Sequence, residues 1–493
     1  MSKVLEGLEP KKVFEYFEEI CAIPHGSGNT KKISDYLVAF ASVRSLKYRQ
    51  DEMGNVIIWK AGTAGYEESA PVIMQGHMDM VCEKESDVEF DFDNQGLELL
   101  LNNNIITANG TTLGGDDGIA VAFMLALLDS DDIPHPPVEM VFTVDEEVGL
   151  LGASGLDCSD IKGRILLNLD SEEEGYLLAG CAGGMTSVAT LPVVRSESTC
   201  KEPKYFRLSI GGLQGGHSGT EIDKGRASAN QIMGRLLYTI NSSYPGIRLI
   251  EVNGGQKDNA IPRTCEAFLL VDAGVVSDTA AKLEALVNDM QVKLRNEYRV
   301  TDKDIALYIE ETDLASVKYA PIDEADTRKV ISLLLNFPGG IQRMSFDIQG
   351  LVETSLNMGI LSTTDNSVSF SFSVRSSVES QKDALADKIK DLIEMYGGTY
   401  SFFGAYPGWE YKPESKLRDV MTEVFEKRYG YSPRVETIHA GLECGVFSQK
   451  LQGLDCMSYG PNMKDIHTPG ESMEVDSVRR TWEYTLEVLK CLK

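Results

Sequence analysis

Short apolar runs alternate with helical patterns through the first third of the chain. The clearest runs are residues 71–75, 138–144 and 164–169, and each predicts a short buried strand. The stretch 118–128 (GIAVAFMLALL) is apolar almost all round, which indicates a buried helix. Strands separated by helical patterns favour an α/β layered domain with a largely parallel sheet.

A different pattern begins near residues 182–185. The chain that follows predicts strands at 206–210, 248–252, 265–271 and 367–374, and helices near 226–240, 278–296 and 380–396. The recurrence of a strand-then-helix unit is compatible with two related halves, but no sequence repeat supports them. We therefore predict an inserted α+β domain over residues 186–401.

After residue 400 the chain returns to a helix, at 415–428, and to short strands. This tail is expected to rejoin the first domain, so that residues 1–185 and 402–493 form one discontinuous domain. The length agrees with such a division, because 493 residues exceed what one compact core holds and two to four domains are expected.

The composition is that of a soluble globular enzyme, with 42% hydrophobic and 25% charged residues. No stretch approaches the ~20 consecutive apolar residues of a membrane helix. The N-terminus leads into a charged amphipathic pattern and lacks the apolar core and cleavage site of a signal peptide. Nine scattered cysteines without a CxxC pair argue against disulfides and a cysteine zinc site. We therefore expect a cytoplasmic protein.

The net charge of −28 excludes two classes of partner. Such a field repels nucleic acid and anionic membranes, so neither is expected to bind. Acidity alone does not indicate metal binding, because acidic surfaces are common and mostly serve solubility. The positions of particular carboxylates therefore decide the interpretation.

Four turns next to the predicted strands and helix carry acidic or histidine side chains. They contain His77 with Asp79, Asp116 with Asp117, the Asp-Glu-Glu run at 145–147, and Asp170. Ligand sites in open α/β sheets lie at the carboxyl edge of the strands. The four turns should meet at one edge of one sheet, and this convergence is the main signal for a site.

Each turn also has a simpler interpretation. A lone carboxylate at a strand end is usually a helix cap or a solvated loop residue, and Asp117 could cap the helix that follows it. The acidic run at 172–174 fits a solvated loop better than a set of ligands. His25 and His135 lie in proline-containing loops and are not expected to act in catalysis. The joint occurrence of all four turns is harder to explain in this way.

The ordered set of motifs resembles the M20 metallopeptidase family, most closely its aminoacyl-histidine dipeptidase branch. The motifs are His-Met-Asp at 77–79, Gly-Gly-Asp-Asp-Gly at 114–118, Asp-Glu-Glu-Val-Gly at 145–149, Asn-Leu-Asp-Ser-Glu at 168–172 and Asp-Ile-His-Thr-Pro-Gly-Glu at 465–471. The resemblance runs nearly the full length. It implies a phosphorylase/hydrolase-like di-metal catalytic domain with a mixed, largely parallel sheet, and an inserted α+β lid domain.

The resemblance also implies a ligand set. His77 and Asp170 would hold one divalent metal ion, Glu147 and His467 would hold a second, and Asp116 would bridge both. Imidazole and carboxylate donors without thiolate suit Zn²⁺, with Mn²⁺ or Co²⁺ as alternatives. Two ions about 3.5–4 Å apart can share a water, lower its pKa and polarise a scissile carbonyl.

Two further residues gain roles from the resemblance. Glu146, beside a ligand but not itself one, would be the general base that moves a proton from the water to the leaving amine. Asp79 would orient the imidazole of His77.

The inserted domain would supply residues that contact the substrate. His217, in Gly-Gly-His-Ser-Gly, would stabilise the oxyanion, while Asn259 and Arg375 would grip the substrate carboxylate. A surface ion pair is the alternative for Arg375. The motif that contains His439 and Glu443 resembles the same branch, and neither residue receives a role beyond substrate contact.

We expect the hydrolysis of unblocked dipeptides, with a preference for a C-terminal histidine, and small peptides as partners. An M20-type deacylase of N-acyl amino acids or an aminotripeptidase would use the same metal site. A non-catalytic metal-binding protein is a third alternative, but the intact Glu146 argues against it. A homodimer that shares His217 is an alternative to a chain that supplies His217 itself.

Overall fold

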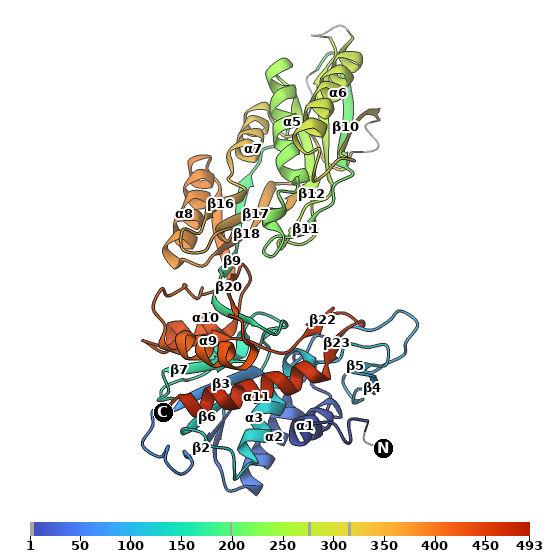
Figure 1. The fold of residues 1–493 in the computed structure, drawn as a ribbon. Helices are drawn as coiled ribbons and strands as arrows, with labels where there is room; N and C mark the ends of the chain where they lie inside the picture. The colour runs from blue at the N-terminus through green and yellow to red at the C-terminus, as the bar shows by residue number, and fades with distance from the viewer. Residues whose placement is uncertain (1–3, 198–199, 275–277, 314–316) are drawn as a thin grey trace. The chain divides into compact units, whose positions relative to one another are not determined.

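The computed structural model describes residues 4–197, 200–274, 278–313 and 317–493. The chain divides into two compact units, which are described separately here (Figure 1). The first unit contains Met1–Cys181 and Tyr406–Lys493, and the second contains Ala182–Ala405. The insertion predicted at 186–401 lies within the second unit.

The first unit contains helices and strands from both ends of the chain. Its N-terminal part comprises α1 (Lys11–Cys21), α2 (Lys31–Val43), β1 (Lys47–Gln50), β2 (Val56–Lys60), β3 (Val72–His77), β4 (Leu99–Asn102), β5 (Ile105–Ala108), α3 (Gly115–Leu128), β6 (Val138–Thr143), α4 (Leu151–Gly155), β7 (Ile165–Asn168) and β8 (Tyr176–Cys181). Its C-terminal part comprises α9 (Lys416–Tyr429), β20 (Arg434–Ile438), α10 (Glu443–Lys450), β21 (Asp455–Ser458), β22 (Met463–Lys464), β23 (Ser472–Glu474) and α11 (Val475–Cys491).

An eight-stranded mixed sheet forms the centre of the first unit, in the order β1-β2-β6-β3-β7-β21-β8-β20. The inner strands β6, β3, β7 and β21 run parallel, whereas β1 and β2 add an antiparallel edge. Three of the inner strands are the predicted runs at 71–75, 138–144 and 164–169. The predicted mixed, largely parallel α/β fold is confirmed, with helices on both sides of the sheet.

Alternate residues of the strands enter two different cores, because successive side chains of a strand point to opposite faces. Val72 and Met74 of β3 join the core formed with α1, α2, α3, α9 and α11, whereas Ile73 joins the core formed with α4 and α10. The helix α3 is buried along its whole length, as its uniformly apolar pattern predicts. Both faces of the sheet are therefore covered, and only its strand ends are available to hold a ligand site.

A small four-stranded sheet, in the order β22-β23-β5-β4, joins the C-terminal segment to the N-terminal part. Ser472, Met473 and Glu474 of β23 pair with Thr107, Ile106 and Ile105 of β5. The loop between β22 and β23, which contains His467, is therefore fixed to the unit that carries the other candidate ligands.

The second unit is built on a nine-stranded sheet, whose main path is β15-β10-β14-β12-β17-β18-β9-β19, with β16 paired to β17. Its elements are β9 (Gly183–Pro192), β10 (Pro203–Gly211), β11 (Gly216–His217), α5 (Ala229–Ser243), β12 (Arg248–Gly254), β13 (Ala260–Ile261), β14 (Cys265–Asp272), α6 (Thr279–Glu297), β15 (Ala306–Thr312), α7 (Glu324–Asn336), β16 (Gly340–Met344), β17 (Val352–Thr363), β18 (Ser367–Ser376), α8 (Glu379–Met395) and β19 (Thr399–Tyr406).

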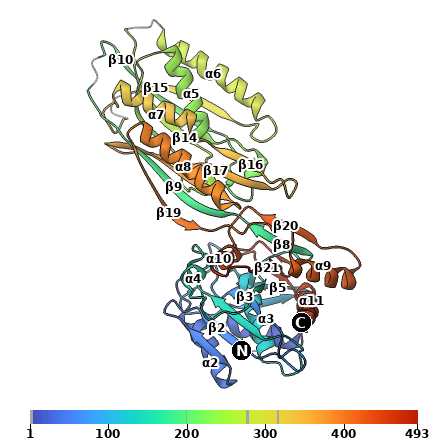
Figure 2. The same cartoon turned by 90° about the vertical axis from the view of Figure 1, so that its left-hand side faces the viewer.

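The helices α5, α6, α7 and α8 pack against this sheet and share one apolar core with its buried side chains (Figure 2). Strand β10 alternates between buried and partly exposed residues, so its other face lies outside this core. This arrangement is the α+β layering that the sequence predicts for the insertion.

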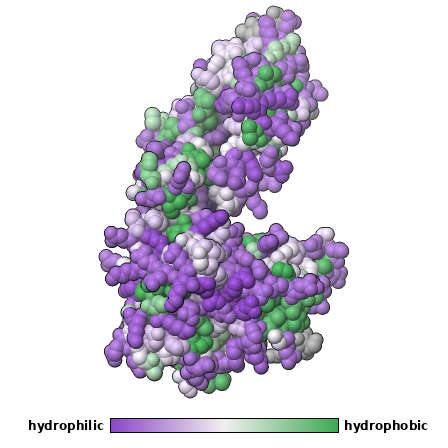
Figure 3. Space-filling model, viewed as in Figure 1, coloured by the Kyte–Doolittle hydropathy of each residue, from purple (hydrophilic) through white to green (hydrophobic). Residues whose placement is uncertain are grey.

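The face of the molecule in Figure 3 is mostly hydrophilic, with scattered apolar patches. Within the part of the chain that the structure describes, none of the helices combines the length and the apolar character needed to cross a membrane.

Candidate metal centre

Three neighbouring parallel strands deliver the first candidate ligands to one edge of the central sheet. β3 ends at His77, β6 leads into the turn at 145–147, and β7 ends two residues before Asp170. The sequence predicts that the first strand ends at residue 75, but the observed strand continues to His77 because Gly76 and His77 pair with Phe142 and Thr143 of β6. His77 is therefore fixed by the sheet itself.

The helix α3 approaches β3 closely at this edge, and Gly76 makes the approach feasible. A Cβ at residue 76 would lie 2.5 Å from Asp117 Oδ2 and 2.5 Å from the Cβ of Ala120. Asp117 does not cap α3. Its Oδ2 instead accepts a hydrogen bond from the backbone N–H of His77 at 3.2 Å, so Asp117 connects the start of α3 to the end of β3.

Asp116 lies between two imidazole rings. Its Oδ1 lies 3.1 Å from Nε2 of His77, and its Oδ2 lies 3.1 Å from Nε2 of His467. The His77 ring also lies 3.9 Å from Asp170 Oδ1, and the His467 ring lies 2.9 Å from Glu147 Oε1. One carboxylate thus offers one oxygen to each of two donor groups, the first with His77 and Asp170 and the second with Glu147 and His467.

The ligand atoms of each group lie within 4.8 Å of one another, which is close enough to surround one metal ion. His77, Asp116, Asp170 and Glu147 are largely buried, whereas the His467 side chain is 45% exposed. The centre is therefore enclosed by the sheet edge and opens to solvent at His467.

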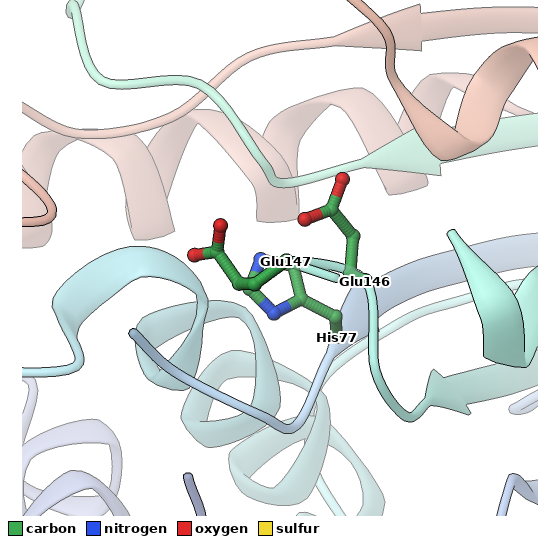
Figure 4. A group of neighbouring side chains, drawn as sticks. All are labelled: His77, Glu146 and Glu147. Atoms are coloured by element: carbon green, nitrogen blue, oxygen red, sulfur yellow. The ribbon is translucent and has the colours of Figure 1, made fainter. Parts of the chain in front are cut away.

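Glu146 and Glu147 leave the same turn in different directions. Figure 4 shows their carboxylates pointing apart, near the imidazole of His77. The Glu147 carboxylate meets His467, whereas Glu146 forms no ion pair with His467 among the described contacts. Burial raises the pKa of Glu146 well above its ordinary value, and the nearby Asp170 raises it further.

Asp79 supports this turn and the His77 ring together. The Nδ1 of His77 lies 3.0 Å from the backbone carbonyl oxygen of Asp79 and 3.5 Å from its Oδ1. The Asp79 carboxylate accepts hydrogen bonds from the backbone N–H of Glu146 at 3.0 Å and from the hydroxyl of Ser27 at 2.8 Å. Asp79 therefore fixes the ring whose other nitrogen faces Asp116 and Asp170, as a group behind a metal ligand does.

Two residues of the centre adopt the left-handed backbone conformation that L side chains rarely take. Asp145 has φ 53° and His467 has φ 61°. Such conformations cost about 1–3 kcal/mol each and persist where the surroundings fix them. The carboxylate of Asp145 accepts the N–H of Gly28 at 2.7 Å, which holds the turn that aims Glu146 and Glu147.

The electrostatics of the centre fit a bound cation. Burial and the neighbouring Asp116 raise the pKa of Asp170 well above its ordinary value, because both disfavour its charged form. Hydrogen bonds with Asp116 and Glu147 raise the pKa of His467 to about 11. Two imidazoles and three carboxylates without thiolate are the donor types that Zn²⁺ and related divalent ions prefer. The residues present therefore fit a pair of divalent metal ions.

Four polar side chains of the strands and of α10 form a hydrogen-bonded group next to the candidate ligands, and the sequence does not predict this group. Glu443, fully buried at the start of α10, accepts hydrogen bonds from Gln75 of β3 and from the Thr143 hydroxyl of β6 at 2.7 Å. Gln75 in turn accepts a hydrogen bond from Asn168 of β7 at 2.7 Å. Glu443 thus links β3, β6 and the start of α10 through these hydrogen bonds.

The acidic run at 172–174 is only partly solvated. Glu173 is exposed, but Glu174 forms a two-pronged ion pair with Arg480 of α11, at 2.7 and 2.6 Å. His25 and His135 are buried, with Nδ1 against the carbonyl oxygens of Ile23 and Pro136. These contacts agree with structural roles for both histidines.

His217, Asn259 and Arg375 all belong to the second unit. His217 Nδ1 accepts the backbone N–H groups of Gly219 at 3.2 Å and Thr220 at 3.1 Å. Burial and the nearby Arg375 lower the pKa of His217, which favours the neutral ring. A neutral ring whose Nδ1 accepts carries its proton on Nε2, so Nε2–H is the group that can donate to a ligand.

Asn259 and Arg375 lie near His217 in the same unit. Asn259 directly precedes β13, and His217 of β11 pairs with Ala260 of that strand. Asn357 of β17 donates to the carbonyl oxygens of Asp258 and Ala260, on either side of Asn259. Arg375 lies on the neighbouring strand β18, mostly buried, which does not fit a surface ion pair.

Fold and centre together define a metallopeptidase, and the sequence comparisons give the same class. The model of peptidase family M20/M25/M40 matches residues 73–490. The chain belongs to this family.

Two relatives are similar over nearly the whole length. The cytosol non-specific dipeptidase of Escherichia coli (strain K12) is 37% identical over 487 residues, covering 99% of this chain and 98% of the relative. The crystal structure of aminoacylhistidine dipeptidase from Vibrio alginolyticus is 36% identical with a TM-score of 0.91, covering 99% of this chain and 98% of that one.

A more distant structure shares the fold alone. Aminopeptidase PepT from Bacillus cereus is 15% identical with a TM-score of 0.54, covering 98% of this chain and 99% of that one.

Proposed function

We propose that this protein is a cytoplasmic di-metal peptidase that hydrolyses unblocked dipeptides, Xaa-His dipeptides among them. The position of Asp116 carries the proposal, because its two oxygens face two separate groups of donors. The names of the two similar relatives, a non-specific dipeptidase and an aminoacylhistidine dipeptidase, support the substrate class.

We assign one metal ion to His77 and Asp170, a second to Glu147 and His467, and the bridge to Asp116. Zn²⁺ suits these donors best, and Mn²⁺ or Co²⁺ are the alternatives. When bound, such a pair supplies a Lewis acid for the scissile carbonyl and a water of lowered pKa.

Glu146 serves as the general base in this proposal. It takes the proton of the attacking water and passes it to the leaving amine, and the raised pKa of its carboxylate makes it a stronger proton acceptor. Asp79 contacts both the His77 ring and the backbone N–H of Glu146, so it fixes the position of the base relative to the ligand His77.

The second unit acts as the lid in this proposal. His217 donates Nε2–H to the oxyanion that forms on the carbonyl oxygen, while Asn259 and Arg375 hold the substrate carboxylate. A substrate carboxylate held at a fixed distance from the scissile bond would restrict cleavage to the bond that precedes the C-terminal residue. Mixed-subunit experiments distinguish a His217 that the same chain supplies from one that a partner copy in a homodimer supplies.

The test is a metal-dependent assay on a panel of substrates. The protein is stripped with chelator and supplied with Zn²⁺, Mn²⁺ or Co²⁺. The panel contains β-alanyl-histidine, Gly-His, Leu-Gly, one tripeptide and one N-acetyl amino acid. We expect metal-dependent cleavage of the dipeptides alone. Cleavage of only the acetylated compound or the tripeptide would favour the deacylase or aminotripeptidase alternative, and no turnover with any metal would overturn the proposal.

A further inference from the structure

Glu471 is a buried carboxylate that the proposed reaction does not use. It lies four residues after His467 and is only 3% exposed. Its Oε2 accepts the backbone N–H groups of Leu113 at 2.8 Å and Gly114 at 3.1 Å. Its Oε1 accepts those of Gly115 at 2.8 Å and Asp116 at 3.4 Å.

These four N–H groups are consecutive and belong to the turn that carries the bridging carboxylate. N–H groups at the start of a helix have no partner within the helix and attract an anion. Each oxygen of Glu471 accepts two of these N–H groups. The carboxylate therefore fixes the backbone of the whole turn, at four residues instead of one. Glu471 thereby holds the backbone of Asp116, while the side-chain oxygens of Asp116 face His77 and His467.

The loop at 465–471 thus contacts the centre twice. Its residue His467 is a proposed ligand, and its residue Glu471 holds the backbone of another. Strand β23, which follows directly, pairs with β5 and keeps the loop in place.

We propose that Glu471 is a positioning residue for the bridging Asp116 and that it couples metal binding to docking of the C-terminal segment. The proposal rests on the proposed function only for the identity of the ligands. Because linkage is reciprocal, a metal ion that holds His467 also strengthens the hold of Glu471 on the turn, and a docked Glu471 strengthens metal binding.

Glu471→Gln is the first test variant. The amide has nearly the same shape, but its NH₂ group faces two backbone N–H donors where the carboxylate accepts them. Glu474→Gln is the matched control, since Glu474 lies on the same segment and contacts Asn104, Asn462 and Arg480 but not the turn. Metal affinity of the full chain is measured by competition of Zn²⁺ with a chromophoric chelator, and the ligand field by the visible absorption of the Co²⁺ form.

We expect Glu471→Gln to weaken metal binding by about 10–100-fold and to change the Co²⁺ spectrum, as loss of a group that positions a ligand does. Glu474→Gln should bind metal like the wild type. Wild-type affinity and an unchanged spectrum in Glu471→Gln would reduce Glu471 to an ordinary helix cap. Neither measurement needs a substrate, so the result stands whether or not dipeptides are cleaved.

Gly115→Ala tests the same contact if Glu471→Gln does not fold. A Cβ at residue 115 would lie 3.2 Å from Glu471 Oε1 and 3.1 Å from the sulfur of Met463, so it disturbs the contact without removing the carboxylate. We expect weaker metal binding in the same direction, by a smaller factor. In the wild type, metal should also slow hydrogen exchange at the amides of residues 113–116; exchange there that does not respond to metal would overturn the coupling.

Discussion

Asp116 and Glu146 have similar chemistry but different surroundings, and their surroundings separate their roles. Asp116 is placed between two imidazoles, which hold its pKa far below the ordinary range despite its burial. Among the described residues Glu146 forms no hydrogen bond with an imidazole, and burial raises its pKa despite the nearby His77. A carboxylate that stays ionised suits a ligand, and a carboxylate with a raised pKa is a stronger proton acceptor, which suits a base.

Replacement of Glu146 separates catalysis from metal binding. Glu146→Gln should lower kcat for dipeptides by about 10²–10⁴-fold, because the amide cannot accept the proton of the attacking water. Metal content, measured by elemental analysis, should equal that of the wild type. Glu173→Gln, at an exposed position of the neighbouring acidic run, is the control and should leave kcat unchanged. Loss of metal from Glu146→Gln would make Glu146 a ligand instead.

Arg375 tests the proposed recognition of the substrate carboxylate. Arg375→Lys keeps the charge but removes the two parallel N–H groups that a carboxylate can bind, so KM for dipeptides should rise about tenfold or more. The exposed Arg299→Lys in the same unit is the matched control. Steady-state kinetics with Gly-His measures KM for both variants, and KM of the control should equal that of the wild type. An unchanged KM in Arg375→Lys would show that Arg375 does not bind the substrate carboxylate.

The sequence predicts much of the centre at this scale, because each candidate ligand stands in a recognisable motif. The role of Asp117 is harder to predict from the sequence. An aspartate suits both a helix cap and a contact with a neighbouring strand, and only the packing of α3 on β3 distinguishes the two. Glu471 stands within a quoted motif, yet nothing in the linear sequence shows that its partners are residues 113–116.

At the scale of the elements, the parallel strands β6, β3 and β7 determine where the ligands meet. Their apolar runs reveal them in the sequence. The polar residues inside these runs, Gln75, Thr143 and Asn168, gave no signal, because a polar residue in a strand is usually assigned to a solvated face. Glu443, the partner of Gln75 and Thr143, lies hundreds of residues further along the chain, and such a long-range pairing leaves no local pattern. Asn168 joins this group through Gln75.

The buried Glu443 should make stability depend on pH. Burial raises its pKa from 4.5 to about 7 in the folded protein. The resulting stabilisation is complete below about pH 4.5 and is lost as the pH rises through about 7, because the folded state binds the proton more tightly than the unfolded chain. Glu443→Gln has no such titration. We therefore compare the free energies of unfolding of the metal-stripped variant and the metal-stripped wild type. The variant's value minus the wild type's should increase by up to about 3 kcal/mol between pH 4.5 and pH 8.

Urea unfolding of both metal-stripped proteins across this pH range measures the difference. Glu436→Gln is the control, because Glu436 is an exposed residue of the preceding strand β20. Its free energy of unfolding should change with pH as that of the wild type does. A difference that stays constant with pH would show that Glu443 does not titrate in this range.

At the scale of the whole molecule, the two units have separate hydrophobic cores. The chain leaves the first unit at Cys181 and re-enters it at Tyr406. Cys181 and Trp409 exchange backbone hydrogen bonds at 2.9 and 3.0 Å, so the exit and the re-entry lie side by side in the first unit. The first unit therefore does not need the second to bring its two segments together.

Excision of the second unit tests this independence. A chain in which a short Gly-Ser linker replaces residues 182–405 should fold and bind two metal ions, because every proposed ligand lies in the first unit. It should not hydrolyse dipeptides, because His217, Asn259 and Arg375 are missing. Circular dichroism, metal titration and the Gly-His assay together check the prediction. An active excised chain would contradict the proposed roles of the three residues.

The position of His467 has a consequence for the order in which the protein is made. The ribosome synthesises His77, Asp116, Glu147 and Asp170 early, whereas His467 and Glu471 follow hundreds of residues later. On the proposed ligand set, a nascent chain cannot complete its centre until His467 has left the ribosome. A product of premature termination before His467 lacks a proposed ligand and is expected to be inactive.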